Sequence, residues 1–330
     1  MANPGPMRYI AVDELEANFG PGKSEHLARE SEQVFLNQLV EIAYDAAWDQ
    51  EVRAIFISGP TSSGKTTFGQ RLGSAVHLFG RKTVHISLDD YYHNMEYVYD
   101  EWGRPNLETI EALDLELIRV QMEALLRGEE VVVPHYDFAK RESSFIEERR
   151  TYIDDNTLMV VEGLHGLSSE IIGKLPHKSV MGVFVCPWAT LVDDETLLEP
   201  EQIRQIRRLA RDHHHRGTSP IATLDYWPVI DLSEKLLFND YLTRADYFVN
   251  TVIPYEFFVL GPMAANYLKA DLERIERGEE VASSLTRGGT LAVPHKAVED
   301  AKYLIKICEQ FPVLPKSFVP PMSILNEFIN

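Results

Sequence analysis

One short segment near position 60 constrains the fold of this chain more than any other. Residues 59–66 read GPTSSGKT, the pattern G-x-x-x-x-G-K-T, and they stand between the apolar run 54–57 and a stretch with helical spacing at 68–79. Between a strand and a helix, small residues allow consecutive backbone N–H groups to curve around a polyphosphate, which also meets the positive end of the helix dipole. A plain Gly/Ser-rich turn would not require the lysine, so the sequence predicts a nucleotide-binding loop.

The residue types in this loop assign roles to its members. Lys65 is expected to reach the β- and γ-phosphates of ATP, and the Thr66 hydroxyl is expected to bind Mg²⁺. ATP is thus the predicted nucleotide and Mg²⁺ the predicted cofactor. The residues predicted to bind ATP are Gly59, Pro60, Thr61, Ser62, Ser63, Gly64, Lys65, Thr66 and Thr67.

The charge of the chain narrows the range of partners. A formal net charge of −19 over 330 residues argues against a protein that wraps nucleic acid, because such a protein needs a basic face to displace counterions. Residues 180–192 are apolar, but this segment is too short for a membrane span and is interrupted by Pro187. We therefore predict neither nucleic-acid nor membrane binding. The acidic charge is compatible with a homo-oligomer.

The cysteines and the N-terminus bear on the compartment. Cys186 and Cys308 are the only cysteines, and they stand far apart in the sequence. A disulfide framework or a zinc site is therefore not expected, and the first residues show no secretory pattern. Both observations predict a reducing, cytoplasmic location.

Short apolar segments alternate with helical patterns along the chain. This order is typical of an α/β fold in which helices cover both faces of a parallel sheet. Further strands are predicted at 83–87, 130–134, 157–161, 179–185 and 247–250, and further helices at 24–48, 113–126, 201–215, 232–244, 262–277 and 294–310.

The same patterns divide the chain into three parts. Residues 1–50 are predicted to be an extension with an amphipathic helix, and residues 51–277 the domain that contains the phosphate loop. Residues 278–330 begin with a polar loop, 278–289, that we expect to be mobile, and continue as a helix and a tail that pack on the core.

Acidic residues follow two of the predicted strands, at the sheet edge where such folds bind ligands. Asp89 and Asp90 follow 83–87, and Glu162 follows 157–161. In P-loop kinases for small molecules, a carboxylate at the end of the strand that corresponds to 83–87 accepts the proton of the attacking hydroxyl. It also holds that hydroxyl in line with the γ-phosphate. Asp89 is the predicted base and a candidate metal contact. Asp90 is the reserve base or a residue that supports the metal ligands, and Glu162 is the predicted acid of the Mg²⁺ shell. A turn cap made by Asp90 is the alternative.

A cluster of arginines stands out in this acidic chain. On the predicted helix 201–215, an arc of about 100° holds Arg204, Arg207, Arg208 and Arg211. Such a helix suits a lid, about 199–218, that closes over ATP and neutralises charge in the transition state. The alternative is a solvated face paired with nearby acidic residues. The three consecutive histidines at 213–215 indicate an exposed helix end.

Aromatic and polar residues alternate before a predicted β-hairpin, in the segment PHYDFAKR at 134–141. Tyr136 and Phe138 are placed to stack on a planar ligand, and Arg141 to donate hydrogen bonds to it. Core aromatic residues are the alternative explanation.

Together these segments resemble the uridine kinase and phosphoribulokinase family of P-loop kinases, especially the bacterial uridine kinase-like nucleoside kinases. The matching segments are GPTSSGKTTF at 59, ISLDDYY at 86, EALDLELI at 111, PHYDF at 134, VVEGLHGL at 160, RQIRRLARDHHHRG at 204 and PPMSILNEFI at 320. Longer members carry an N-terminal domain related to threonyl-tRNA synthetase, which this sequence lacks. The resemblance implies a nucleoside-kinase-like P-loop fold with an arginine-rich helical lid and a β-hairpin at the acceptor site.

The resemblance also implies roles for individual residues. Asp89 becomes the base for a sugar 5′-hydroxyl, and Arg204 a contact to the ribose. The implied catalytic residues are Asp89, Lys65, Arg204 and Arg208. Arg207 and Arg211 join the ATP-binding residues, and the implied metal residues are Thr66, Glu162 and Asp89. The implied substrate-binding residues are Tyr92, Glu108, Tyr136, Phe138, Arg141 and Arg204.

The sequence departs from the uridine kinase pattern at three places, and the first two leave the acceptor open. Glu108 stands where those kinases carry an aspartate for the ribose hydroxyls, and Arg141 replaces a histidine that reads the pyrimidine edge. Gln202-Ile203 replaces an Asp-Thr pair before the first lid arginine.

The sequence therefore predicts an ATP-dependent kinase acting on the 5′-hydroxyl of a nucleoside, with uridine or cytidine as first candidates. A kinase for another sugar or alcohol, like the phosphoribulokinases and pantothenate kinases, is one alternative. A nucleotide-binding regulator without kinase activity is the other. A GTPase is disfavoured because the sequence has no Asn-Lys-x-Asp guanine signature.

Overall fold

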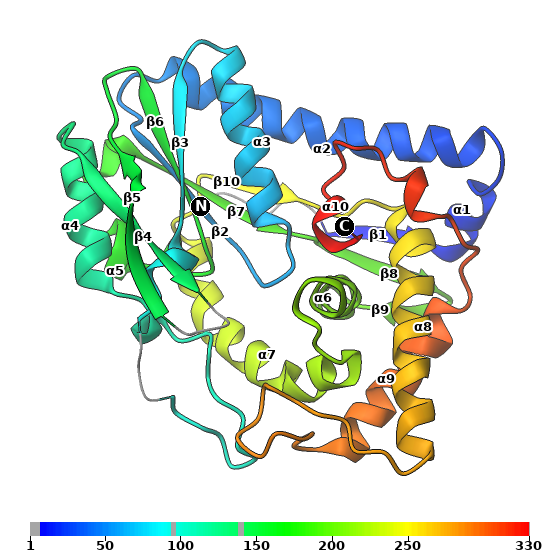
Figure 1. The fold of residues 1–330 in the computed structure, drawn as a ribbon. Coiled ribbons are helices and arrows are strands. Elements are labelled where there is room, and N and C mark those ends of the chain that lie inside the picture. The colour runs from blue at the N-terminus through cyan, green and yellow to red at the C-terminus, as the bar shows by residue number, and fades with distance from the viewer. Residues whose placement is uncertain (1–6, 94–96, 138–141, 330) are drawn as a thin grey trace.

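A five-stranded parallel sheet forms the centre of the protein (Figure 1). The computed structural model describes residues 7–93, 97–137 and 142–329. In the order β10-β7-β2-β6-β3, the strands are Tyr247–Asn250, Val180–Cys186, Ala54–Ser58, Thr157–Glu162 and Lys82–Ser87. Every neighbouring pair is parallel, which confirms the predicted α/β architecture. The central strand β2 ends directly before the phosphate loop.

Both faces of this sheet are covered. Alternate residues of β2 point to opposite sides. Ile55 and Ile57 join the core that includes residues of α2 (Lys23–Trp48) and α3 (Lys65–Leu78). Ala54 and Phe56 join a second core, built with residues of α4 (Leu115–Leu126). Burial on both sides explains why this strand reads as a continuous apolar run.

Two smaller sheets flank the central one. β4 (Val131–Asp137) and β5 (Glu142–Thr151) pair antiparallel, as the predicted hairpin requires. The other sheet has the order β1-β8-β9, with strands Arg8–Ala11, Ala189–Asp193 and Glu195–Leu198, and none of these strands was predicted. Because β1 pairs with a segment far along the chain, its strand conformation depends on tertiary contact more than on local pattern.

Two helices begin earlier than their patterns indicate. α7 spans Pro220–Leu242 and α8 spans Glu256–Glu276, so Pro228 and Pro262 lie inside them. The predicted helix 262–277 starts at Pro262, a residue that is common in the first turn of a helix but here lies inside α8. The first turns of α7 are buried all round, and such a helix has no amphipathic period by which to recognise it.

The remaining helices complete the layers around the sheets. They are α1 (Val12–Ala17), α5 (Ser169–Ile172), α6 (Pro200–Arg216), α9 (Pro294–Cys308) and α10 (Asn326–Ile329), with 3₁₀ turns at Leu88–Tyr91, Ile110–Ala112, His177–Ser179 and Lys316–Phe318. Within the described residues, no helix combines the length and the apolar character that crossing a bilayer requires.

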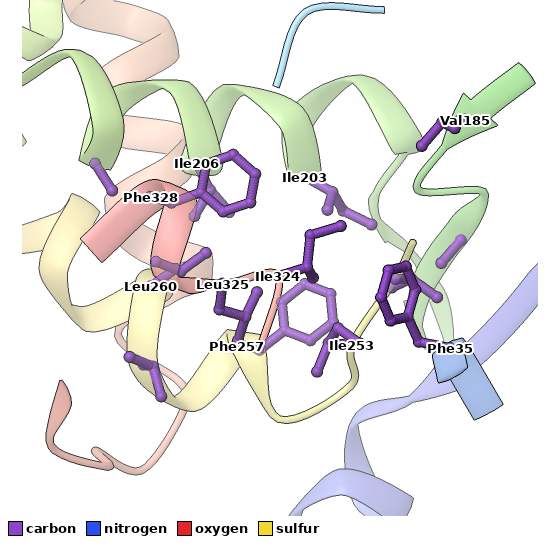
Figure 2. Close-up of a cluster of buried hydrophobic side chains, with 14 of the residues drawn as sticks. Phe35, Val185, Ile203, Ile206, Ile253, Phe257, Leu260, Ile324, Leu325 and Phe328 are labelled. Carbon is purple, nitrogen blue, oxygen red and sulfur yellow. The ribbon is translucent and has the colours of Figure 1, made fainter. Parts of the chain in front are cut away.

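The C-terminal part of the chain packs on the core. α9 lies against α7 and α8. The loop at 278–289, expected to be mobile, is held by an Ala282–Thr290 bridge and by a hydrogen bond from the Arg287 amide to the Gly103 carbonyl. Figure 2 shows Ile324, Leu325 and Phe328 of the tail within a cluster of buried side chains that includes residues of α6 and α8. This packing brings the tail beside the phosphate loop.

Candidate active site

The phosphate loop has the geometry that its sequence predicts. It leads from β2 into α3, and it contains two glycines whose positions exclude a side chain. Gly64 has φ +91°, a left-handed conformation, and a Cβ on Gly59 would lie 2.0 Å from the Val185 carbonyl oxygen. Close packing of this backbone against β7 therefore fixes the start of the loop.

Two hydroxyl groups of the loop fit a phosphate ligand. The Oγ atoms of Ser62 and Ser63 are buried and have no hydrogen-bond partner within the described part of the chain. Buried polar groups without partners cost free energy, and phosphate oxygens would accept hydrogen bonds from both. The Lys65 ammonium folds back onto the loop and donates to the carbonyl oxygens of Gly59 (3.0 Å) and Pro60 (2.9 Å).

A cavity of about 180 Å³ opens beside the loop. It brings together eleven of the residues singled out from the sequence, which are Thr61, Ser62, Gly64, Lys65, Thr66, Asp89, Tyr92, Glu108, Glu162, Arg208 and Arg211. Its wall also contains Arg216 and Glu327, which the sequence reasoning did not single out. The carboxylates of two strand ends, the loop and part of the arginine helix thus share one cavity.

Asp89 and Glu162 are buried at this edge of the sheet. Burial raises the pKa of Asp89, with Lys65 opposing the shift and Glu108 adding to it. Burial, followed by the charge of Asp89, raises the pKa of Glu162 to about 7. Glu162 accepts hydrogen bonds from the hydroxyls of Ser87 (2.9 Å) and Thr66 (3.4 Å). Hydroxyl and carboxylate oxygens are suitable Mg²⁺ ligands, so Thr66 and Glu162 fit the predicted metal.

The raised pKa of Glu162 predicts how the stability of the ligand-free protein depends on pH. An ordinary glutamate loses its proton near pH 4.5, whereas the folded-state Glu162 keeps it up to about pH 7. As pH rises through this window, the unfolded state ionises first, and the folded state loses stability. Relative to Glu162→Gln, the wild type should lose on the order of 2 kcal/mol between pH 5 and pH 8, measured by urea unfolding. If the difference in free energy of unfolding between the two proteins stays constant with pH, the raised pKa of Glu162 is contradicted.

Asp90 points away from the cavity that Asp89 lines. Its carboxylate faces the hairpin, where it binds Arg149 (2.6 Å) and His135 (3.1 Å). Burial works to raise the pKa of Asp90, but the hydrogen bonds from Arg149 and His135 outweigh it and lower the pKa. Asp90 does not line the cavity, so the expectation of a reserve base at this position is not met by the geometry.

Arg208 and Arg211 reach the cavity, together with Arg216 at the end of α6. Arg208 donates to the Thr61 hydroxyl at 2.8 Å and lies 3.7 Å from Glu108. Asp212 organises the group, because its carboxylate pairs with Arg208, Arg211 and Arg216. Although burial opposes the shift, these arginines hold the pKa of Asp212 at about 2.

The other two arginines of the predicted lid are structural. Arg207 is fully buried, and its guanidinium is bound by the Glu256 carboxylate (2.6 Å) and the Thr251 carbonyl (2.7 Å). Arg204 pairs with Glu234 at 2.7 Å. Neither lines the cavity, which corrects the expectation of a phosphate contact for Arg207 and a ribose contact for Arg204.

The surroundings of α6 explain this difference. The helix packs against α7, α8 and α10, so arginines on one arc meet different neighbours. Arg204 acts on the loop indirectly, because Glu234 also accepts a hydrogen bond from the Thr61 amide at 2.9 Å. The histidines at 213–215 are exposed, as expected for a helix end.

Tyr92, Leu107 and Glu108 form another part of the cavity wall, and Tyr92 and Glu108 are the residues predicted to bind the acceptor. Tyr136 is buried and does not line the cavity; its ring lies 5.7 Å from that of Tyr92. Its position agrees with the core alternative more closely than with direct stacking on a ligand. Phe138 and Arg141 lie outside the described residues.

Comparison with known proteins places the chain in a family. Residues 54–244 match the phosphoribulokinase / uridine kinase family, and this match covers more than half of the chain. The chain belongs to this family. The match spans the phosphate loop, both strand-end carboxylates and the arginines of α6, which form most of the cavity wall; Glu327 lies outside the matched range.

Individual relatives are distant. A uridine kinase of Halobacterium salinarum is 27% identical over 176 residues, covering 53% of this chain and 68% of that protein. A uridine kinase of Schizosaccharomyces pombe is 26% identical over 214 residues, covering 64% of this chain and 42% of that protein. Among solved structures, a possible uridine kinase from Bacillus stearothermophilus has a TM-score of 0.39 at 18% identity, covering 60% of this chain and 88% of the other.

Proposed function

We propose that this protein is a Mg-ATP-dependent kinase that transfers the γ-phosphate to the 5′-hydroxyl of a nucleoside, with uridine or cytidine as first candidates. The observation that carries the proposal is the shared cavity, in which the Asp89 carboxylate lies with Lys65 of the phosphate loop and with three arginine side chains of α6. A cavity for nucleotide binding alone would not require a buried carboxylate at this position. The names of the relatives support a nucleoside as acceptor.

In this proposal the side chains of the cavity divide the work. Asp89 accepts the proton of the acceptor hydroxyl, and its raised pKa makes the ionised form a stronger base. Glu108 and Tyr92 orient the sugar, while Arg208 and Arg211 stabilise negative charge on the transferred group. Thr66 and Glu162 would hold the Mg²⁺ ion. When bound, Mg-ATP supplies the phosphoryl group and the positive charge that offsets its oxygens.

A second candidate acceptor is an anionic sugar or alcohol. Arg216 adds a third guanidinium to the cavity, beside Arg208 and Arg211. Three cations exceed what a neutral nucleoside requires, and they suit an acceptor with its own phosphate or carboxylate.

The test is ADP formation with Mg-ATP across a panel of ribonucleosides, deoxynucleosides, pantothenate and sugar phosphates, with product masses recorded. A monophosphate from uridine or cytidine is the expected result. A product from an anionic acceptor alone would favour the second candidate. Slow ATP hydrolysis that no acceptor stimulates would indicate a nucleotide-binding regulator.

A further inference from the structure

The C-terminal tail contributes a carboxylate to the phosphate loop. Glu327 of α10 lines the cavity, and its Oε2 accepts hydrogen bonds from the backbone amide of Thr67 (3.2 Å) and from the Thr67 hydroxyl (2.8 Å). These residues are 260 positions apart. The contact therefore exists only because the tail folds back onto the core.

The Thr67 amide is one of the groups that the loop offers to its ligand. The first backbone hydrogen bond within α3 runs from the Phe68 amide to the Gly64 carbonyl at 2.9 Å, so the Thr67 amide has no acceptor inside the helix. Amides of this first turn bind phosphate, and an anion is stabilised there by the helix dipole. The Glu327 carboxylate thus occupies a position suited to a phosphate oxygen.

Buried neighbours hold Glu327 in this place. A Cβ on Gly64 would lie 2.3 Å from Cδ1 of Ile324, so the tail packs directly on the loop. On the other side of Glu327, the Phe328 ring lies 5.2 Å from the Arg207 guanidinium. Figure 2 shows both Ile324 and Phe328 inside the apolar cluster. The contact between Glu327 and Thr67 is therefore held by buried neighbours, whereas an exposed side chain would be free to move.

Glu327 also adds negative charge where the nucleotide would place its own. Glu327 lines the same cavity as Asp89 and Glu162, so its carboxylate adds to the acidic groups beside the loop. A polyphosphate that entered the loop would meet the charge of Glu327 at the Thr67 end. Both anions cannot accept the same amide hydrogen.

We propose that Glu327 is an internal competitor of the nucleotide phosphates, an inference that rests on the proposed ATP-binding function. In the nucleotide-free protein, its carboxylate occupies the Thr67 end of the loop. Binding of Mg-ATP displaces that carboxylate, so the C-terminal tail lowers nucleotide affinity and rearranges locally when the site fills.

The test compares the full-length wild type with Glu327→Gln, which keeps the size of the side chain and removes its charge. The variant should bind Mg-ATP about three- to tenfold more tightly by calorimetry, because a charged competitor has been replaced by a neutral one. Glu309→Gln is the matched control. Glu309 is an exposed residue that pairs with Lys269 outside the cavity, so its replacement should leave the dissociation constant unchanged.

A second measurement reports on the tail itself. In the wild type, backbone amides of residues 322–329 should exchange hydrogen faster when a non-hydrolysable ATP analogue with Mg²⁺ is bound. Slower exchange together with weaker binding by Glu327→Gln would overturn the inference and make Glu327 a contact to the nucleotide or its metal. Equal affinity of both proteins would also overturn it, while leaving the proposed function intact. If neither protein binds Mg-ATP, the proposed function fails, and the inference with it.

Discussion

The Asp89→Asn variant is expected to turn over at least about 100-fold more slowly than the wild type, with the dissociation constant for Mg-ATP changed much less. Asparagine keeps the shape of the side chain but cannot accept the proton of the acceptor hydroxyl. Asp89 lines the same cavity as Lys65, so loss of its carboxylate should slow the phosphoryl transfer step more than it weakens nucleotide binding. Steady-state assays with the acceptor identified from the panel, combined with calorimetry for Mg-ATP, separate the two effects.

Asp90→Asn is the matched control, because the same change is made at the neighbouring residue. Asp90 faces Arg149 and His135 of the hairpin, so its replacement weakens an anchoring contact without removing a group from the cavity. We expect a much smaller loss of turnover than for Asp89→Asn. Wild-type activity in Asp89→Asn would remove Asp89 from the mechanism, and a larger loss in Asp90→Asn would transfer the role of base to its neighbour.

The Arg207→Met variant is expected to lose about 3–5 kcal/mol of folding stability. Arg207 is fully buried, and methionine would leave the Glu256 carboxylate in the core without its cation. The Thr251 carbonyl would also lose a donor. Equilibrium unfolding in urea measures the loss. The double variant Arg207→Met/Glu256→Gln should recover part of the stability, because the uncompensated charge has been removed.

Arg119→Met provides the comparison on the surface. Arg119 pairs with Glu116 and Glu123 on the outer side of α4, where solvent screens the interaction, so little change in stability is expected. If Arg207→Met were as stable as Arg119→Met but bound Mg-ATP far more weakly, the assignment of Arg207 to the core would be wrong. Arg207 would then act at the phosphates, as the helix pattern alone indicates.

Much of the central architecture could be predicted from local sequence. The apolar run before Gly59 becomes the central strand, and the positions of Asp89 and Glu162 after two other strands bring both carboxylates to one sheet edge. This works because parallel strands that are buried on both faces are continuous apolar runs, and their carboxyl ends meet at the same edge. The role of the loop glycines could also be predicted, since positive φ and close backbone packing require glycine at these positions.

Pairings between distant segments could not be predicted. Nothing local in residues 8–11 indicates that they pair with β8, and the arginine pattern of α6 does not distinguish Arg208, which reaches the cavity, from Arg207, which does not. Helical spacing predicts only the direction in which a side chain points around the helix axis. The partner that it meets is set by the elements packed around the helix, here α7, α8 and α10.

The sequence by itself therefore determined the strand–loop–helix unit, the parallel sheet and the two carboxylates at its edge, because each depends on local pattern and backbone geometry. Tertiary structure alone decided which arginines line the cavity and which are paired in the core. It also decided that Glu327 reaches the phosphate loop. Such contacts depend on packing between segments separated by much of the chain, and no local periodicity encodes that packing.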